Sequence, residues 1–261
     1  MSNNIQSDNK KFRGKYILIM LACMIVGGIV GFCVSFFSHD GSGNVFDSFA
    51  AGLEQLLTVV APWGIPVVSA ALLIPAFGRM RRARALLAAW DGEDEDAAEA
   101  IEACTDRVLL LCHLLMLSIM LFIGMCLVYL TRLETILNLV LLMVSVVLFL
   151  ADLIIAVRLQ QQVVDLIRTM NPEKEGSVYD LKFQEKWLDS CDENERRQIG
   201  EASYKAFTAG SKACASLWAV LILTHLMFGT GLLPIAVVLG IWAVLLITYH
   251  VNAAKAGRRK K

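Results

Sequence analysis

Residues 135–157 read TILNLVLLMVSVVLFLADLIIAV, and this stretch decides the class of protein to which the chain belongs. Asp152 is its only charged side chain. A helix of about 20 apolar residues spans a hydrocarbon core of about 30 Å, and lipid offers no hydrogen-bond partner to an irregular backbone. Similar runs recur along the chain, which predicts six transmembrane helices at residues 16–37, 56–77, 108–130, 135–157, 208–228 and 232–253.

The composition supports this class and argues against several functions. Hydrophobic residues make up 57% of the 261 residues, compared with about 45–50% in a soluble domain. The formal net charge is zero, so there is no overall basic field and we expect no nucleic-acid partner. The seven cysteines are scattered without a CxxC pair or zinc-type spacing. We therefore predict no metal, no cofactor and no disulfide framework.

Basic residues are distributed unevenly among the connections. The three short connections, at residues 38–55, 131–134 and 229–231, contain a single one, Arg132. Basic residues near membrane spans tend to remain in the cytosol, which predicts a protein of the cytoplasmic membrane with both termini cytosolic. A cleaved signal peptide is an alternative for the first run, but the run is longer than a usual signal core, which favours a retained helix.

The sequence thus predicts an all-α, polytopic membrane protein whose six transmembrane helices form three hairpins with cytosolic helical extensions. Between the hairpins lie an acidic helical segment and a longer polar one, both predicted to be cytosolic. The predicted order is an N-terminal tail at 1–15, hairpins at 16–77, 108–157 and 208–253, the acidic segment at 78–107, the polar segment at 158–207 and a basic tail at 254–261.

Two of the predicted spans carry unusual residues. The second contains Pro62, Gly64, Pro66 and Pro75, and proline removes a helix hydrogen bond and kinks the helix. The kink is either a packing feature or a broken helix of the kind that marks binding sites in transporters. The first span has small residues at four-residue spacing, which suits an internal packing seam or a dimer face; they are Cys23, Gly27, Gly31 and Ser35.

Segment 78–107 begins with four arginines and then becomes acidic. Glu95, Glu99, Glu102 and Asp106 share one face by helical spacing. This face is either solvated and neutralised by the nearby arginines, or a site for a cation or a partner. The helix that carries it is expected to continue directly into the third span.

Segment 158–207 begins with a helical extension of the fourth span, predicted to reach Met170 before Asn171-Pro172 ends it. Tyr179, Phe183 and Trp187 then recur every four residues, which predicts a short amphipathic helix. Its aromatic stripe is a candidate partner surface or a packing face. A capping box formed by Ser190 and Glu193 is expected to start the helix of the fifth span.

The same segment carries a resemblance to a known family. The matching residues are 171–180, followed by Lys182-Phe183, Lys186-Trp187-Leu188, Ser190-Cys191-Asp192-Glu193 and Tyr204-Lys205-Ala206, with Trp90-Asp91-Gly92-Glu93 and Gly231-Leu232-Leu233-Pro234 elsewhere. They resemble a family of uncharacterised membrane proteins of Gram-positive bacteria, a domain of unknown function. The resemblance implies six spans, a bacterial source and no assigned activity. Asn194 and Arg196-Arg197 depart from the family pattern.

Three ionisable residues lie inside predicted spans, where such residues are costly and are functional candidates by default. They are His113, Asp152 and His250, each about 8–9 Å inside the cytosolic end of its helix at 1.5 Å per residue. If they face one another, they form an intramembrane polar cluster that can relay protons, since a carboxylate neighbour tunes a histidine near neutral pH. Otherwise each reaches the headgroups or satisfies a helix–helix hydrogen bond.

These observations predict a non-enzymatic accessory or regulatory membrane protein that presents cytosolic helices to a membrane or cytosolic protein partner. Motifs for nucleotide binding, metalloproteases and serine hydrolases are absent from the sequence, and we assign no catalytic, cofactor-binding or metal-binding residue. The alternative is a small proton-coupled transporter or channel that uses Asp152, His113 and His250. The lipid bilayer is an expected partner in both cases, and the oligomeric state is not indicated.

Overall fold

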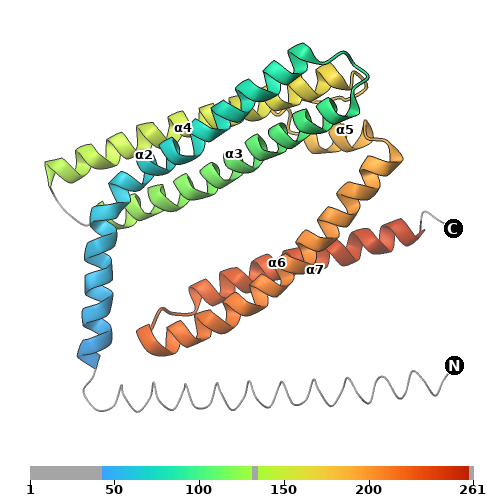
Figure 1. Cartoon of the computed structure of the whole chain (residues 1–261). Coiled ribbons are helices and arrows are strands. Elements are labelled where there is room, and N and C mark those ends of the chain that lie inside the picture. The colour runs from blue at the N-terminus through green and yellow to red at the C-terminus, as the bar shows by residue number, and fades with distance from the viewer. Residues whose placement is uncertain (1–42, 131–134, 259–261) are drawn as a thin grey trace, which may run out of the picture. The chain divides into compact units, whose positions relative to one another are not determined.

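The computed structural model describes residues 43–130 and 135–258, and over these ranges its regular structure is entirely helical (Figure 1). Five of its helices are long and apolar enough to cross a membrane. The helices are α2 (Gly43–Ala89), α3 (Glu95–Leu130), α4 (Ile136–Met170), α5 (Phe183–Asp189), α6 (Glu193–Phe228) and α7 (Leu233–Arg258).

Five predicted spans coincide with α2, α3, α4, α6 and α7. The first predicted span, residues 16–37, lies with its small-residue face outside the described residues, as does Arg132. Two predicted extensions are confirmed, because α3 already begins at Glu95 and α4 continues to Met170. Residues 43–55 of the predicted connection at 38–55 belong to helix α2, and the rest of that connection lies outside the described residues.

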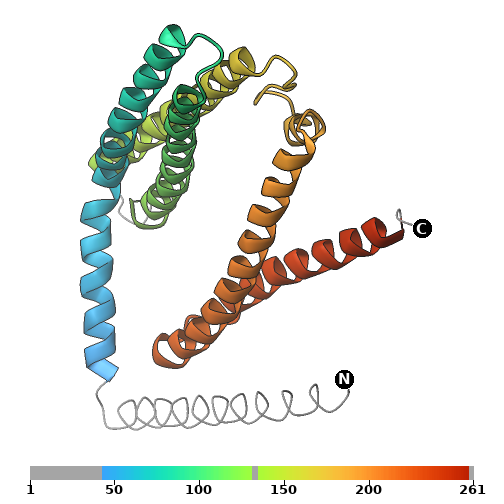
Figure 2. The ribbon, with the colours of Figure 1, turned by 45° about the vertical axis from the view of Figure 1, so that its right-hand side comes forward.

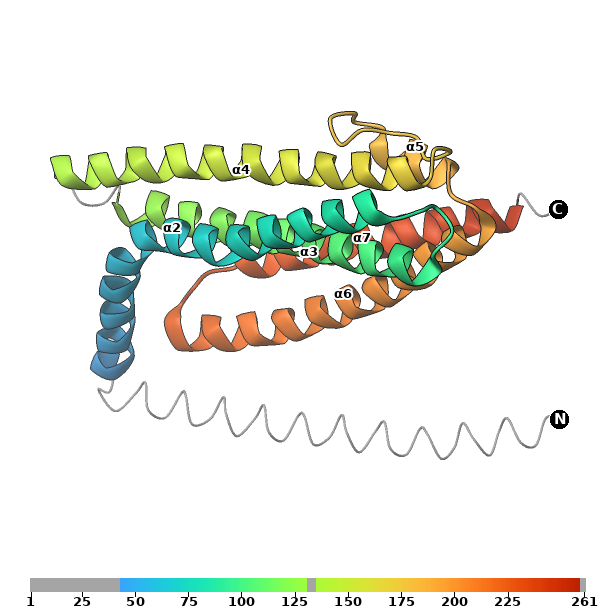
Figure 3. The same ribbon diagram turned by 45° about the horizontal axis from the view of Figure 1, so that its top comes forward.

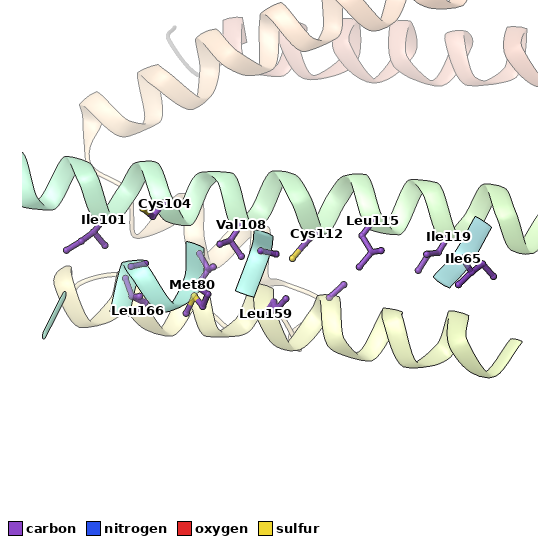
Figure 4. Packing of buried hydrophobic residues seen from close by; sticks show 14 residues of the cluster. Ile65, Met80, Ile101, Cys104, Val108, Cys112, Leu115, Ile119, Leu159 and Leu166 are labelled. Atoms are coloured by element: carbon purple, nitrogen blue, oxygen red, sulfur yellow. The ribbon is translucent and has the colours of Figure 1, made fainter. Parts of the chain in front are cut away.

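The chain divides into two compact units, and each is described by itself. In the unit of residues 52–199, the later part of α2 packs side by side with α3 and α4 (Figures 1 and 2). Each helix contributes one apolar face to a shared core (Figure 4). On α3 the buried positions are spaced three or four residues apart, as in a helix with one buried stripe; they are Ile101, Cys104, Val108, Cys112, Leu115 and Ile119.

Helix α2 is one continuous helix that contains Pro62, Pro66 and Pro75, but its axis bends sharply in its first half (Figure 1), so the second span is bent without being interrupted. The close contact with α3 is made at Gly64. A Cβ atom on Gly64 would lie 2.0 Å from a ring carbon of Phe122, which is far inside van der Waals contact. Only glycine therefore lets the Phe122 ring lie directly on the backbone of α2, and this contact sets the register between α2 and α3.

The second unit includes residues 200–261, with most of α6 and all of α7. These two helices touch where the rings of Phe207 and Tyr249 stack with centroids 4.3 Å apart. Near the connection, the backbone N–H of Gly231 donates a hydrogen bond to His225 Nδ1 at 3.0 Å.

Large apolar side chains are exposed along α4 and α7, including Ile136, Val147, Leu233 and Val244. In water such continuous apolar surfaces are rare on a monomeric protein. They are the expected outer surface of helices that contact lipid.

Candidate functional site

The segment after α4 folds back along the helix that precedes it (Figure 3). Gln161 of α4 holds this return, because its Oε1 accepts hydrogen bonds from Ser177 Oγ at 2.9 Å and from the backbone N–H of Val178 at 2.7 Å. Arg168 adds a third tie by donating from Nε to the backbone oxygen of Lys174 at 3.2 Å. The side chains of α4 therefore order a segment that has no regular secondary structure.

Helix α6 starts with a reciprocal capping box formed by Asp192 and Glu195. Asp192 Oδ1 accepts from the Glu195 N–H at 2.7 Å, and Glu195 Oε2 accepts from the Asp192 N–H at 3.0 Å. The predicted box of Ser190 and Glu193 is wrong by two residues. Ser190 instead donates to the backbone oxygen of Trp187 at 2.8 Å, at the end of the preceding helix. The capping box therefore begins at Asp192, two residues after the serine that the S-x-x-E pattern selected.

Lys174 and Glu195 form an ion pair between the return segment and the start of α6, in which the lysine is buried and the glutamate is partly exposed. Lys174 is 3% exposed, and its ammonium lies 5.9 Å from the centroid of the Trp187 ring, within range of a cation–π contact. Burial by itself lowers the pKa of Lys174, but the hydrogen bond and negative charge of Glu195 outweigh it, so this pKa lies above the ordinary lysine value. Lys174 is therefore charged at neutral pH, and Glu195 serves both this pair and the capping box.

A recess of about 200 Å³ opens beside this ion pair. Helix α3 contributes one wall, the end of α4 a second, and the segment from Lys174 to Ile199 the rest. Polar and apolar groups both line it: Glu102, Thr105, Asp106, Ile167, Asn171, Lys174, Trp187, Cys191, Glu195, Gln198 and Ile199.

The three aromatic residues of the predicted stripe do not form one surface. Helix α5 covers only Phe183–Asp189, so Tyr179 lies in a turn before it. Phe183 packs on Trp187 with ring centroids 5.6 Å apart, and both are partly buried while Tyr179 is exposed. Gly176 permits this arrangement, because it has a φ of +124° and a Cβ there would lie 2.9 Å from the Phe183 ring.

The acidic start of α3 is ordered by aspartate caps. Asp94 Oδ1 accepts from the N–H groups of Asp96 and Ala97 at 3.0 and 3.2 Å, which caps the helix. Asp91 accepts from the N–H groups of Glu93 and Asp94, and these bonds lower the pKa of its carboxyl.

The side chains of Glu95, Glu99, Glu102 and Asp106 are all exposed. In the described part of the chain, no ion pair joins them to the arginines at the end of α2. The interpretation that those arginines neutralise this acidic face is therefore not supported, and its charge remains available to solvent or to a partner.

The unit of residues 52–199 is called the α2–α4 unit below. Of the three ionisable residues predicted to lie inside spans, only Asp152 is buried, at 5% exposure. Its carboxylate contacts Ser69 Oγ of α2. Ser69 also donates to the backbone oxygen of Ile65 at 2.7 Å. Ser69 was missed at the sequence level, where its only signal was a hydroxyl in an apolar helix, and such hydroxyls often bond their own backbone.

His113 and His250 are placed differently from Asp152. Both side chains are exposed, on α3 and α7 respectively, and His250 makes an edge contact with the adjacent Tyr249 ring. The structure therefore joins Asp152 to Ser69 and shows no hydrogen bond between Asp152 and His113. His250 belongs to the other compact unit. Over the described ranges, no group of three or more His, Cys, Asp or Glu residues is arranged to hold a metal ion.

Several long apolar helices with lipid-type outer surfaces define a multi-pass helical membrane protein. Within that class, the chain belongs to the DUF3169 family, described as protein of unknown function, whose sequence profile matches residues 10–253. This confirms the resemblance to a domain of unknown function. Neither a curated protein nor a solved structure matches the chain.

Proposed function

We propose that this protein is a non-enzymatic accessory or regulatory membrane protein that presents an ordered cytosolic site to a protein partner. The observation that carries the proposal is the recess beside the Lys174–Glu195 pair, which is held in shape by bonds from both α4 and α6. A site that is ordered before binding loses less conformational entropy when a partner docks.

The charge of the recess supports a basic partner segment. Glu102 and Asp106 lie on its wall with exposed carboxylates, while the single lysine is already paired with Glu195. The acidic face continues along α3 through Glu99 and Glu95. A Lys- or Arg-containing segment entering the recess meets complementary charge, which favours both fast association and a defined orientation.

The experiment that tests this function is co-purification in mild detergent after cross-linking in cells, followed by mass spectrometry. The double variant Glu102→Lys/Asp106→Lys is expected to lose the partner that the native chain recovers. Glu185→Lys is the matched control, since Glu185 is an exposed carboxylate on α5 that does not line the recess. Recovery of the native chain alone, or equal recovery of the partner by all three proteins, argues against the proposal.

We also propose that the protein lies in the cytoplasmic membrane of a bacterium. Both termini and the recess beside Lys174 would then face the cytosol. The uneven distribution of basic residues supports this orientation. Cys191 is a poor reporter of it, because its side chain is buried. Asn194→Cys places an exposed thiol on α6 instead, and a membrane-impermeant reagent is expected to label it only after the cells are opened.

A second candidate function, proton-coupled transport, is favoured by the burial of Asp152. A carboxyl group enclosed in a helical bundle and bonded to one hydroxyl is a typical proton-binding group of transporters. Asp152→Asn in proteoliposomes is expected to abolish proton-linked flux. His113→Ala and His250→Ala test whether the two histidines take part, as the sequence-based hypothesis proposed. If both variants keep proton-linked flux while Asp152→Asn loses it, the histidines are not part of the mechanism. Unchanged flux in Asp152→Asn contradicts the candidate.

A further inference from the structure

We propose that Tyr179 and Leu181 insert into the lipid headgroup region, so that the segment between α4 and α5 anchors the charged end of the α2–α4 unit to the membrane surface. The partner in this contact is the phospholipid interface. The inference concerns residues that do not line the recess beside Lys174, so it stands independently of the proposed function.

The level of the membrane edge follows from the register of α2 and α3. Gly64 contacts Phe122. Arg79 lies fifteen residues after Gly64, and Arg107 lies fifteen residues before Phe122. Because the two helices are antiparallel and meet at Gly64 and Phe122, Arg79 and Arg107 lie at the same height. They are the basic residues nearest to the apolar part of each helix. Charged residues of this kind mark the boundary of the hydrocarbon region.

The register between α2 and α4 extends this level to α4. Ser69 contacts Asp152, and the two helices run in the same direction, because Met80 and Leu87 share a surface with Gln162 and Thr169. Arg79 is ten residues beyond Ser69, and Gln162 is ten beyond Asp152. Gln161 and Gln162 therefore lie at the height at which α2 and α3 become charged.

Gln161 is also the residue that binds the return segment. Its side chain accepts from Ser177 and Val178, and the segment therefore returns along α4 (Figure 3). The residues that follow Val178 are thus held near the height inferred above for the membrane edge. Tyr179 is 64% exposed and Leu181 is fully exposed. Two large exposed side chains therefore follow directly after the residues that Gln161 binds, although they lie well beyond the end of the span in sequence.

The polar residues between and after them suit the same environment. The carboxylate of Asp180 is paired with Lys186 at 2.6 Å, so it does not face the membrane as an isolated negative charge. Lys182 is exposed next to Leu181, and a lysine side chain can lie along apolar surface while its ammonium reaches a phosphate. Tyrosine is enriched at membrane–water interfaces because its ring is apolar and its hydroxyl is polar.

Site-specific photo-cross-linking tests this contact directly. A benzophenone amino acid replaces Leu181 in the full chain, intact membranes are irradiated, and the purified protein is analysed by mass spectrometry. Asp96 is the control position, since it is exposed on α3 eleven residues before Arg107, or about 16 Å farther from the membrane edge at 1.5 Å per residue. We expect a phospholipid adduct at position 181 and none at position 96.

Two other outcomes overturn the inference. A cross-link from position 181 to a protein, without lipid adducts, assigns this surface to a protein partner. Absence of any lipid adduct at position 181, while a benzophenone at Leu139 on the exposed face of α4 gives one, shows that the segment stays in water. As a second measurement, the fluorescence that Tyr179→Trp adds to that of the native chain and its five tryptophans should be quenched in nanodiscs by lipids brominated near the headgroup, whereas the fluorescence that Asp96→Trp adds should not be.

Discussion

Two polar pairs in the unit of residues 52–199, one among the apolar helices and one at its charged end, each contain one buried partner, but they differ in their surroundings. Asp152 and Ser69 meet between α2 and α4, surrounded by apolar side chains. Lys174 and Glu195 meet at the charged end, where Glu195 also caps α6 and its side chain is 38% exposed. The first pair is a single contact in a low-dielectric core, whereas the second is the centre of a network. Shared partners make a network worth more than its separate bonds, so the two pairs should respond differently to substitution.

The largest effect is expected from Lys174→Met. Breaking one half of a buried ion pair costs about 3–5 kcal/mol, and partial exposure of Glu195 reduces this to roughly 2–3 kcal/mol because water solvates the carboxylate left behind. We expect faster hydrogen exchange across residues 171–199 with little change in α3 and α4. The double variant Lys174→Met/Glu195→Gln removes the unpaired charge and should recover part of the loss; no recovery would show that the pair is not the stabilising feature.

Gly64→Ala tests the close contact between α2 and α3. The added methyl group collides with the Phe122 ring, and overpacking of this kind costs about 1–3 kcal/mol. A thermal unfolding assay in detergent should show a lower midpoint, and Phe122→Leu combined with Gly64→Ala should restore most of it. Gly78→Ala is the matched control, because a Cβ at Gly78 meets no atom within 4 Å; an equal loss there would rule out the steric explanation.

Asp192→Ala distinguishes the capping box from the rest of the Lys174–Glu195 network. Loss of an N-cap side chain costs about 1 kcal/mol, and the first turn of α6 should then exchange its amide hydrogens faster. Ser190→Ala removes the residue that sequence reasoning chose as the cap, and its effect on α6 should be smaller, since Ser190 bonds only to the Trp187 carbonyl. A larger effect of Ser190→Ala than of Asp192→Ala on hydrogen exchange in α6 would instead support Ser190 as the cap.

The smallest effect at neutral pH is expected from titration of Lys174. Its pKa is raised in the folded chain, so the stability it contributes is fully present below the unfolded lysine value of about 10.4 and is lost as pH rises through the raised pKa. Hydrogen exchange of residues 171–199, corrected for its intrinsic pH dependence, should therefore be steady through neutral pH and accelerate only in strongly alkaline solution. Lys174→Met should lack this acceleration of hydrogen exchange at alkaline pH. If the variant shows the same acceleration, the titrating group is not Lys174.

Much of the helical layout was predictable from the sequence. The hydropathy of residues 135–157 identified α4, the breaker at Asn171-Pro172 identified its end, and the acidic run after Gly92 identified the start of α3. The capping box of α6 was placed two residues early, because Ser190 and Asp192 are both good caps and the local pattern does not rank them. The candidate site was recovered only in part: Trp187 does line the recess, but Tyr179 lies elsewhere.

By itself, the sequence determined that this is a membrane protein with long apolar helices, because transfer into lipid depends on the composition of each stretch and needs no knowledge of its neighbours. Only the tertiary structure decided which polar groups meet. Ser69 and Asp152 are separated by 83 residues, Ser177 and Gln161 by 16, and Lys174 and Glu195 by 21. Such contacts depend on helix register and on a chain reversal. Both are decided by how residues far apart in sequence fit together, as Phe122 does on Gly64 and Ser177 on Gln161.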